Sequence, residues 1–358
     1  MTRSRLIAFY LPQFHPIPEN DKWWGRGFTE WTNVASAAPL FAGHLQPDLP
    51  AHLGFYDLRL AEARHAQADL AAEYGLHGFC YYHYWFCGKR LLERPFNEVL
   101  ASGEPKFPFC LCWANETWSR RWLGEEQDIL IRQTYSLDDD VRHAQWLAQA
   151  FSDQRYITIT GRPMFLIYRP GDLPQPERTT ETLKRECVRA GVPEPYLVGV
   201  DGHSPGRDFR VWGFDRTLVF EPQLGVLPDF NTDGWTLGKL RRNLAHGLVS
   251  GRLKVYDCDV ARHLMAKRKR HFPYIQSVLV GWDNTPRRGR DAIVVVKSTP
   301  ESFERALAAA MDAARLDGQE DPIVFINGWN EWAEGNHLEP GQQYGLEFLK
   351  RVQGLSLG

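Results

Sequence analysis

The sequence has 358 residues, with 42 Lys and Arg against 44 Asp and Glu, so its formal net charge is −2. Because nucleic-acid binding calls for a strongly basic face, this charge gives no electrostatic case for a nucleic-acid partner. A composition of 43% hydrophobic and 24% charged residues is that of an ordinary globular protein. No stretch approaches the roughly 18 consecutive apolar residues of a membrane span, so none is expected.

The cysteines and the N-terminus indicate a reducing compartment. None of the six cysteines has the CxxC spacing of a zinc site, and Cys80, Cys110 and Cys112 lie inside apolar, strand-like runs. We therefore expect buried free thiols. The apolar run at residues 6–10 is too short for a signal peptide, which makes the expected localisation cytoplasmic.

Short apolar runs alternate with helical patterns along the whole chain, which indicates parallel β/α units. The predicted strands are residues 6–11, 78–83, 107–113, 164–168, 196–200, 217–220, 274–280 and 323–327. The predicted helices are residues 57–74, a short one around 96, one beginning after 136–138, and 179–190, 260–268 and 300–315.

Eight strands with intervening helices are the number that a closed barrel requires. A long loop follows the first strand, and Asp57 is expected to cap the helix that comes after it. Residues 222–256 are rich in loops, but no repeat or flexible linker divides the chain. We predict an α/β fold, a single (β/α)8 TIM barrel with long βα loops, as one catalytic domain over residues 1–358. An open doubly wound sheet is the alternative, although no glycine-rich phosphate loop follows the first strand.

Polar and aromatic residues gather just after the predicted strands, where the active sites of β/α barrels form. Amides, carboxylates and flat aromatic rings at such a rim are suited to sugars, because the rings of sugars have hydroxyl groups and apolar C–H faces. The 13 Trp residues fit this interpretation. The predicted substrate-binding residues are Tyr10, Gln13, His15, Trp24, Glu30, Trp31, His83, Trp85, Trp113, Asn115, Glu116, Tyr168, Asp201, Glu221, Trp282, Asp283, Asn284, Arg287, Trp329, Asn330 and Trp332.

Glu331 and Glu334 are the predicted catalytic pair. Glycoside chemistry needs one carboxylic acid to protonate the leaving oxygen and a second carboxylate to assist attack. The two residues lie three apart, in Trp-Asn-Glu-Trp-Ala-Glu-Gly after the last strand. This spacing keeps both side chains within one site, and two neighbouring carboxylates cannot both ionise easily, so one of them can serve as the acid.

Two other patterns suggest metal sites only weakly. His15, His83 and His203 follow different strands, without the spacing of a zinc motif. Residues 138–140 and 257–259 resemble the D-x-D motif of nucleotide-sugar transferases, but both precede helices, where Asp serves as a cap. We expect no metal and no cofactor.

Five blocks of the sequence resemble the WbsX-type proteins, which are often called glycoside hydrolase family 99-like. These blocks are residues 8–16, 24–34, 113–116, 281–287 and 329–335, and together they extend over nearly the whole chain. The resemblance implies a β/α barrel and a role with bacterial surface polysaccharides such as O-antigen or capsule. WbsX-type proteins have been labelled glycosyltransferases, whereas the more distant endo-α-1,2-mannosidases of family 99 are retaining hydrolases.

The resemblance also assigns roles to the two glutamates. The family 99 hydrolases have an Asn-Glu-Trp-His-Glu-Gly box, and here Ala333 stands in place of its histidine. By this match Glu334 is the general acid/base. Glu331 is the base that helps the substrate's own 2-hydroxyl attack the anomeric carbon.

Three functional hypotheses follow from these patterns. The first is a retaining glycoside-processing enzyme acting on an α-linked bacterial oligo- or polysaccharide. The second is a glycosyltransferase in lipopolysaccharide or O-antigen biosynthesis, and the third is a non-catalytic carbohydrate-binding barrel. The sequence leaves the sugar, its linkage and the oligomeric state open.

Overall fold

A computed structural model describes residues 3–120, 125–203, 206–227, 253–267, 270–317 and 321–357. Its centre is a closed barrel of eight parallel strands, in which β1 pairs with both β2 and β15 and so joins the two ends of the sheet. The strands are β1 (Arg5–Tyr10), β2 (Gly78–Phe86), β4 (Phe109–Trp113), β8 (Arg162–Ile167), β9 (Tyr196–Asp201), β10 (Arg216–Val219), β12 (Tyr274–Leu279) and β15 (Ile323–Asn327). The predicted TIM barrel is confirmed.

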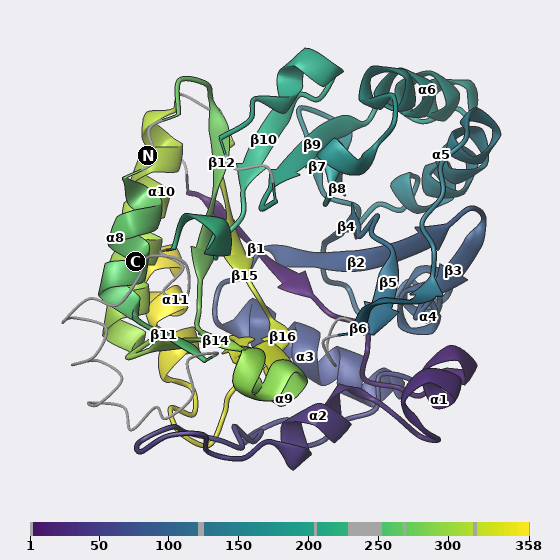
Figure 1. Cartoon of the computed structure of the whole chain (residues 1–358). Coiled ribbons are helices and arrows are strands. Elements are labelled where there is room, and N and C mark those ends of the chain that lie inside the picture. Colours follow the sequence, from purple (N-terminus) through teal and green to yellow (C-terminus); the bar gives the residue numbers. More distant parts are fainter. Residues whose placement is uncertain are drawn as a thin grey trace.

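Helices surround the barrel and cover its outer face (Figure 1). Most are amphipathic, and their apolar sides pack on the strands in one continuous core. Among the described residues, this layer contains α3 (Ala61–Glu73), α4 (Arg94–Ser102), α5 (Leu137–Phe151), α6 (Pro176–Arg189), α10 (Pro300–Leu316) and α11 (Glu347–Leu357), which follows the last strand. Helix α8 (Cys258–Ala266) packs in a separate apolar cluster with Leu279 and Trp282.

Side chains alternate along each barrel strand between the interior and the helix layer. In β1, the Phe9 ring contacts the rings of Tyr82, Phe220 and Phe325, which come from three different parts of the barrel wall. The next residue, Tyr10, points the other way and donates its hydroxyl to Gln67 of α3. This alternation decides which residues at the strand ends reach the mouth of the barrel.

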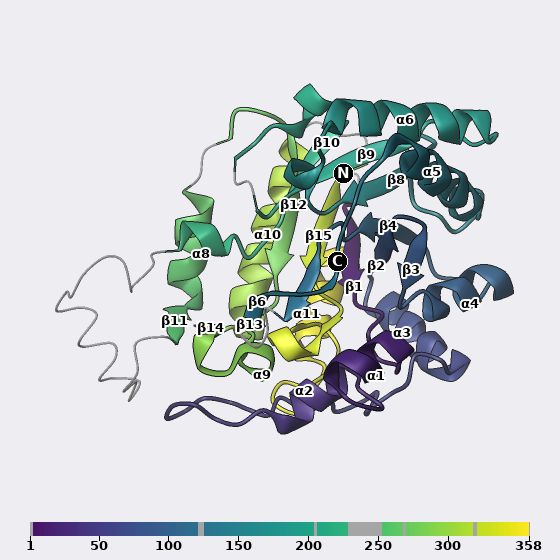
Figure 2. The same cartoon turned by 45° about the vertical axis from the view of Figure 1, so that its right-hand side comes forward.

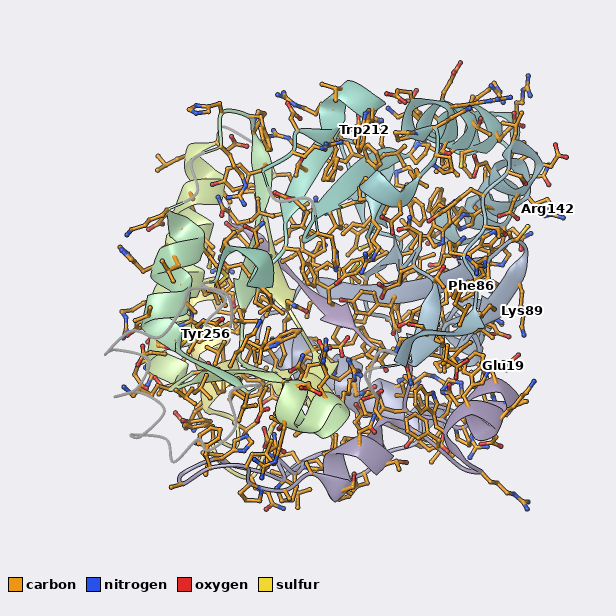
Figure 3. All side chains as sticks on the ribbon, viewed as in Figure 1. Glu19, Phe86, Lys89, Arg142, Trp212 and Tyr256 are labelled. Atoms are coloured by element: carbon orange, nitrogen blue, oxygen red, sulfur yellow. The ribbon has the colours of Figure 1, made fainter. Side chains whose placement is uncertain are left out.

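The segment between β1 and α3 is more structured than the predicted long loop. It contains α1 (Pro18–Trp24) and α2 (Glu30–Ser36). Lys89 of the short strand β3 (Lys89–Leu91) forms a 2.6 Å ion pair with Glu19 of α1, and the two side chains approach each other in Figure 3. Asp57 does not cap α3: its carboxylate binds Arg59 instead, and the helix begins after Leu60.

Further elements cluster at the carboxyl ends of the strands. The turn η6 (Trp332–Glu334), the short helix α9 (Thr285–Arg288) and helix α2 lie together at this end, and Figures 1 and 2 show α9 beside α2. Beside them is a small sheet of β11 (Lys254–Asp257), β14 (Ile293–Val296) and β13 (Trp282–Asp283). Of the predicted loop-rich stretch 222–256, residues 228–252 lie outside the described residues.

Two sequence-based expectations concern cysteines and membranes. Cys80, Cys110, Cys112, Cys187 and Cys258 are buried free thiols, as predicted, but Cys87 is exposed. It lies just beyond the end of β2, where the chain turns toward β3. Within the described part of the chain, no helix combines the length and hydrophobicity that crossing a bilayer requires.

Candidate active site

A cavity of about 520 Å³ opens at the carboxyl ends of the barrel strands. This is the end at which β/α barrels carry their active sites, and the volume is in the range of small-molecule sites. Nine of the residues predicted from the sequence line it: Gln13, Trp24, Glu116, Tyr168, Trp282, Asn284, Arg287, Glu331 and Glu334.

Glu331 and Glu334 reach this cavity because the chain turns sharply after β15. Asn330 is buried and fixes the start of the turn, since its side chain accepts from the Leu11 N–H at 2.7 Å and donates to the Leu11 carbonyl at 3.0 Å. The 3₁₀ turn η6 then brings both glutamates to one wall. The Glu331 side chain is 8% exposed and that of Glu334 is 22% exposed, so Glu334 is the more accessible of the two.

One guanidinium group holds both glutamates. Arg287 of α9 donates to Glu334 at 2.6 Å and to Glu331 at 3.2 Å. Behind it, Arg287 also pairs at 3.1 Å with Glu30 of α2, whose side chain is completely buried. Segments at positions 30, 287 and 331–334 are therefore joined by a single cation.

This cluster contains three carboxylates and one cation in a buried place. Burial raises the pKa of Glu331 and of Glu334, and the attraction of Arg287 offsets this only in part. The neighbouring carboxylates add to the effect, because like charges at close range resist ionising together. In contrast, the same carboxylates raise the pKa of Arg287 despite its burial, so it remains a cation. The cluster can thus keep a proton near neutral pH.

A second ion pair lies on the opposite side of the cavity. Glu116, which follows β4, forms a 2.7 Å ion pair with Arg169, which follows β8. The buried Asn115 fixes this pair in position, because its side chain accepts from the Arg169 N–H at 2.7 Å and donates to the Arg169 carbonyl at 2.9 Å. The predicted Asn115 therefore positions a lining residue and does not line the cavity itself.

Four predicted residues point away from the cavity, into the helix layer. Tyr10 binds Gln67, as described above. His83 lies parallel to the Trp146 ring of α5, with the ring centroids 4.6 Å apart. The indole N–H groups of Trp85 and Trp113 donate to Asp139 and to the Trp85 carbonyl, respectively. All four lie on the outward face of their strands.

Other predicted residues form the support of the site. Trp329 is fully buried against Phe79, and Trp332 donates its indole N–H to Glu339 at 2.6 Å. Trp31 of α2 donates to the Tyr56 carbonyl at 2.8 Å. His15 is 1% exposed, and burial lowers its pKa to about 4, so it is neutral at physiological pH.

The three remaining predicted acids also lie outside the lining of this cavity. Asp201 is completely buried and accepts from the Gly206 N–H at 2.7 Å. Burial raises the pKa of Glu221, at the end of β10, to about 7. Asp283 accepts from His44 and from Gln46, both at 2.7 Å, and lines a separate cavity.

Several lining residues were absent from the prediction. Tyr82 and Tyr84 of β2 line the cavity, whereas the predicted His83 and Trp85 of the same strand do not. The sequence Tyr-His-Tyr-Trp shows the alternation but not which of its two sets faces inward. Other lining residues outside the predicted substrate-binding set are Asn20, Trp118, Arg169, His203, Phe220, Arg288 and Asn327, of which His203 was considered only as a metal ligand.

The described residues contain no group of three or more His, Cys, Asp or Glu side chains placed to hold a metal ion. The acidic cluster of the cavity is bound to Arg287 instead. Asp257 caps α8, and residues 138–140 form the first turn of α5 behind the cap Ser136. These D-x-D patterns are therefore helix starts.

Comparison with models of known protein families identifies the family of this chain. The model of the family described as Glycosyltransferase WbsX matches residues 6–352, which is nearly the entire chain. The chain belongs to the WbsX family. This is a family of carbohydrate-active enzymes, in agreement with the resemblance drawn from the sequence blocks.

Two relatives are described as uncharacterized proteins named WxcX, from the strains B100 and ATCC 33913 of Xanthomonas campestris pv. campestris. Each is 42% identical to this WbsX-family chain, over 348 and 347 residues, respectively. The matches cover 97% of this chain but 48% of each relative. The chain thus spans about half the length of the curated relatives that it matches.

Solved structures share the barrel fold at low sequence identity. A glycoside hydrolase-like protein is 13% identical, with a TM-score of 0.62 over 99% of this chain and 94% of its own. The GH99 endo-alpha-mannosidase from Bacteroides thetaiotaomicron is 14% identical, with TM-scores of 0.55 and 0.56 in two structures that cover 99% of this chain and 97% of theirs. The WbsX-family chain therefore has the fold of the GH99 enzymes.

Proposed function

We propose that this protein is a retaining glycoside-processing enzyme that acts on an α-linked bacterial surface glycan, with residues 1–358 as one catalytic domain. The observation that carries this proposal is the shared binding of Glu331 and Glu334 to Arg287 on the wall of a large cavity. Two carboxyl groups with raised pKa values at a barrel mouth are suited to moving protons at a glycosidic bond.

Glu334 is the proposed general acid/base. Its side chain is the more exposed of the pair, so it has the better access to a leaving-group oxygen. Glu331 lies deeper and is the proposed base. By the resemblance to the family 99 hydrolases, it takes the proton from the substrate's 2-hydroxyl as that oxygen attacks the anomeric carbon, while Glu334 protonates the departing oxygen.

The second step reverses these proton transfers. Water attacks the anomeric carbon and opens the three-membered ring, while Glu334 accepts the proton of the water and Glu331 returns its proton to the 2-oxygen. Each carboxyl group ends as it began, and two inversions at the anomeric carbon give net retention. Arg287 supports this exchange, because its charge stabilises whichever carboxyl group is ionised at each stage.

The test uses a panel of α-glycosyl fluorides of bacterial hexoses and 6-deoxyhexoses, with fluoride release as the readout. We expect Glu331→Gln to lower kcat/KM on these fluorides by about 10²- to 10⁴-fold, the usual contribution of acid–base groups. Glu334→Gln should cause the same loss on the matching O-linked α-disaccharides, because their leaving oxygen needs a proton and fluoride does not. NMR of the first-formed product should show the α-anomer. Full turnover in either variant, or a β-anomer as first product, rules out the proposed roles.

Glycosyl transfer is the second candidate, and the description of the family as a glycosyltransferase motivates it. Arg288 lines the cavity and has no carboxylate within ion-pair distance among the described residues, which leaves a cation for a donor phosphate. Thermal-shift measurements with UDP-, GDP- and dTDP-sugars, with and without Mn²⁺, distinguish this candidate. Stabilisation by a nucleotide sugar that Arg288→Ala abolishes would favour transfer over hydrolysis.

A further inference from the structure

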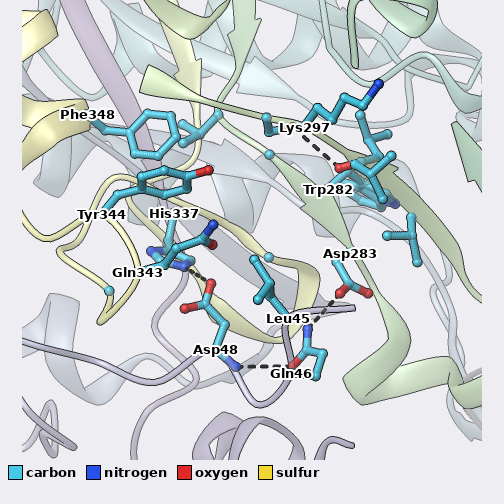
Figure 4. Close-up of a pocket in the computed structure, with 18 of the residues that line it drawn as sticks. Leu45, Gln46, Asp48, Trp282, Asp283, Lys297, His337, Gln343, Tyr344 and Phe348 are labelled. Atoms are coloured by element: carbon cyan, nitrogen blue, oxygen red, sulfur yellow. Dashed lines mark hydrogen bonds and ion pairs between the residues drawn. The ribbon is translucent and has the colours of Figure 1, made fainter. Parts of the chain in front are cut away.

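A second cavity lies behind the turn that carries Glu334. It encloses about 170 Å³, against 520 Å³ for the candidate active site, and it opens to the surface between residues 43–48, the sheet of β13 and β14, and residues 335–348. Figure 4 shows the side chains that line it. Its size allows one sugar ring and not an extended chain.

Aromatic side chains form one part of its wall. Tyr344 and Phe348 lie edge to face, with their ring centroids 5.4 Å apart. Trp282 lines this cavity and also the candidate active site, so its ring lies between the two. Trp282 is only 8% exposed. Its buried indole N–H has no hydrogen-bond partner in the described part of the chain.

Polar side chains form the opposite part of the cavity wall, and hydrogen bonds to one another hold them in place. Asp48 pairs with His337 at 2.9 Å, and Asp283 accepts from both His44 and Gln46 at 2.7 Å. His337 is itself fixed by stacking on Trp332, with the ring centroids 3.6 Å apart. In Figure 4, Asp48, Gln46 and Asp283 lie across the cavity from Tyr344 and Phe348.

The cations at this cavity are paired with carboxylates. Burial lowers the pKa of His337, but the carboxylate of Asp48 more than offsets this, so that the pKa is raised. Both ring nitrogens of His337 face acceptors, the Glu339 carbonyl at 2.7 Å and Asp48 at 2.9 Å, which suits a protonated imidazole. Asp283 accepts from Nε2 of His44, whose Nδ1 accepts from the Leu40 N–H at 3.0 Å, so this imidazole donates to Asp283 as a neutral ring. Lys297 at the rim is paired with Asp257 at 2.8 Å. Among the described residues that line this cavity, no unpaired cation is left for a phosphate or a uronate.

Besides the Trp282 ring, close-packed backbone separates the second cavity from the candidate active site. A Cβ atom at Gly281 would lie 2.6 Å from the carbonyl oxygen of Gly335, the residue after Glu334. Gly335 has a φ of +56°, and a Cβ atom there would lie 2.9 Å from that of Asp283. A ligand in the second cavity would therefore rest against the chain segment that positions Glu334.

We propose that this cavity is a second binding site, which takes one neutral, hydroxyl-rich ring such as a pyranose. The aromatic rings offer flat apolar faces for the C–H groups of the ring, while the carboxylate and amide groups accept and donate hydrogen bonds to hydroxyls. The choice of a sugar as the ligand rests on the proposed function. The existence of the binding site does not, since the site needs no catalysis by Glu331 or Glu334.

The test measures binding of methyl glycosides by saturation-transfer difference NMR. The neutral probes are methyl α-mannoside, α-glucoside, α-galactoside, α-rhamnoside and N-acetyl-α-glucosaminide, and the charged probes are methyl α-glucuronide and glucose 1-phosphate. Leu45→Trp places a large side chain at the cavity, from a residue that is 60% exposed and so tolerates it. Leu60→Trp is the matched control, because Leu60 is 56% exposed and lines neither cavity.

We expect at least one neutral glycoside to give a signal that persists in the Glu331→Gln/Glu334→Gln double variant. This signal should fall about fivefold in Tyr344→Ala, the loss expected when a ring-stacking contact is removed. It should fall about as far in Leu45→Trp, because the larger side chain fills the cavity, and it should remain in Leu60→Trp. The proposal is overturned if no neutral probe gives a signal sensitive to Leu45→Trp, or if the charged probes bind better. If the wild-type protein showed this binding pattern but did not act on the glycosyl fluorides, the proposed function would be refuted and the second binding site would stand.

Discussion

Arg287 and Glu334 are joined by a 2.6 Å hydrogen bond, although they lie 47 positions apart in the sequence. The bond connects the loop after β12 with the loop after β15, and both residues face the same cavity. Since Arg287 also binds Glu331 and Glu30, this contact makes the acid pair part of a larger charged cluster.

Replacing Arg287 by Met tests this cluster. The substitution leaves three carboxylates without their cation, and breaking a buried ion pair typically costs about 3–5 kcal/mol of unfolding free energy. We expect this loss in urea unfolding at pH 7, together with a shift of the pH–rate profile to higher pH as the carboxyl groups become harder to ionise. Arg287→Lys should recover part of the stability, because a lysine retains the charge but not the forked geometry. A Met variant as stable as the wild type would contradict the account.

The alternation of β2 gives a second prediction. Trp85 donates to the buried Asp139, so Trp85→Phe leaves this carboxylate with one donor fewer. We expect the substitution to lower the free energy of unfolding by about 1–3 kcal/mol and to leave kcat/KM within about twofold of the wild type. Tyr84 lines the cavity, so Tyr84→Phe should change kcat/KM and leave unfolding nearly unaffected. Thermal unfolding and fluoride release measured on both variants test which face of β2 lines the cavity. If Trp85→Phe altered activity and Tyr84→Phe altered stability, the two faces of the strand would be misassigned.

Asn330 should matter for activity without touching substrate. Asn330→Ala removes both hydrogen bonds to Leu11 and leaves a buried N–H and carbonyl unpaired, at about 1–3 kcal/mol each. Because the turn holding Glu331 then loosens, we expect kcat to fall more than KM rises. A variant that changes KM alone would instead place Asn330 in contact with the substrate.

A pH-dependent prediction concerns Asp140, far from the chemistry. Burial raises the pKa of Asp140 to about 6, although Thr179 donates a hydrogen bond to it. Because this pKa is raised in the folded state, the stabilisation is present below the unfolded value of 3.8 and is lost as the pH rises through about 6. The unfolding free energy of the wild type relative to Asp140→Asn should thus fall by about 3 kcal/mol between about pH 4 and pH 7.

The matched control is Asp138→Asn in the same helical turn, since Asp138 is exposed. Its unfolding free energy should follow that of the wild type across this range. Equal pH dependence in Asp140→Asn and in the wild type would show that Asp140 is ionised throughout.

The sequence by itself determined the barrel and the place of the acid pair. Apolar runs separated by helical patterns require parallel strands with crossover helices, and residues that follow such strands must meet at one end of a barrel. Glu331 and Glu334 follow the last strand, so their position at the mouth was predictable from local pattern alone.

Only the tertiary structure decided which neighbours of these strands line the cavity. A strand of period two has two possible faces, and a strand rich in aromatic residues on both faces, such as β2, does not reveal which one is inward. Closure of the barrel makes that choice, placing Tyr84 inside and Trp85 against α5. The convergence of Glu30, Arg287 and Glu334 depends likewise on loops that meet only once the barrel has closed.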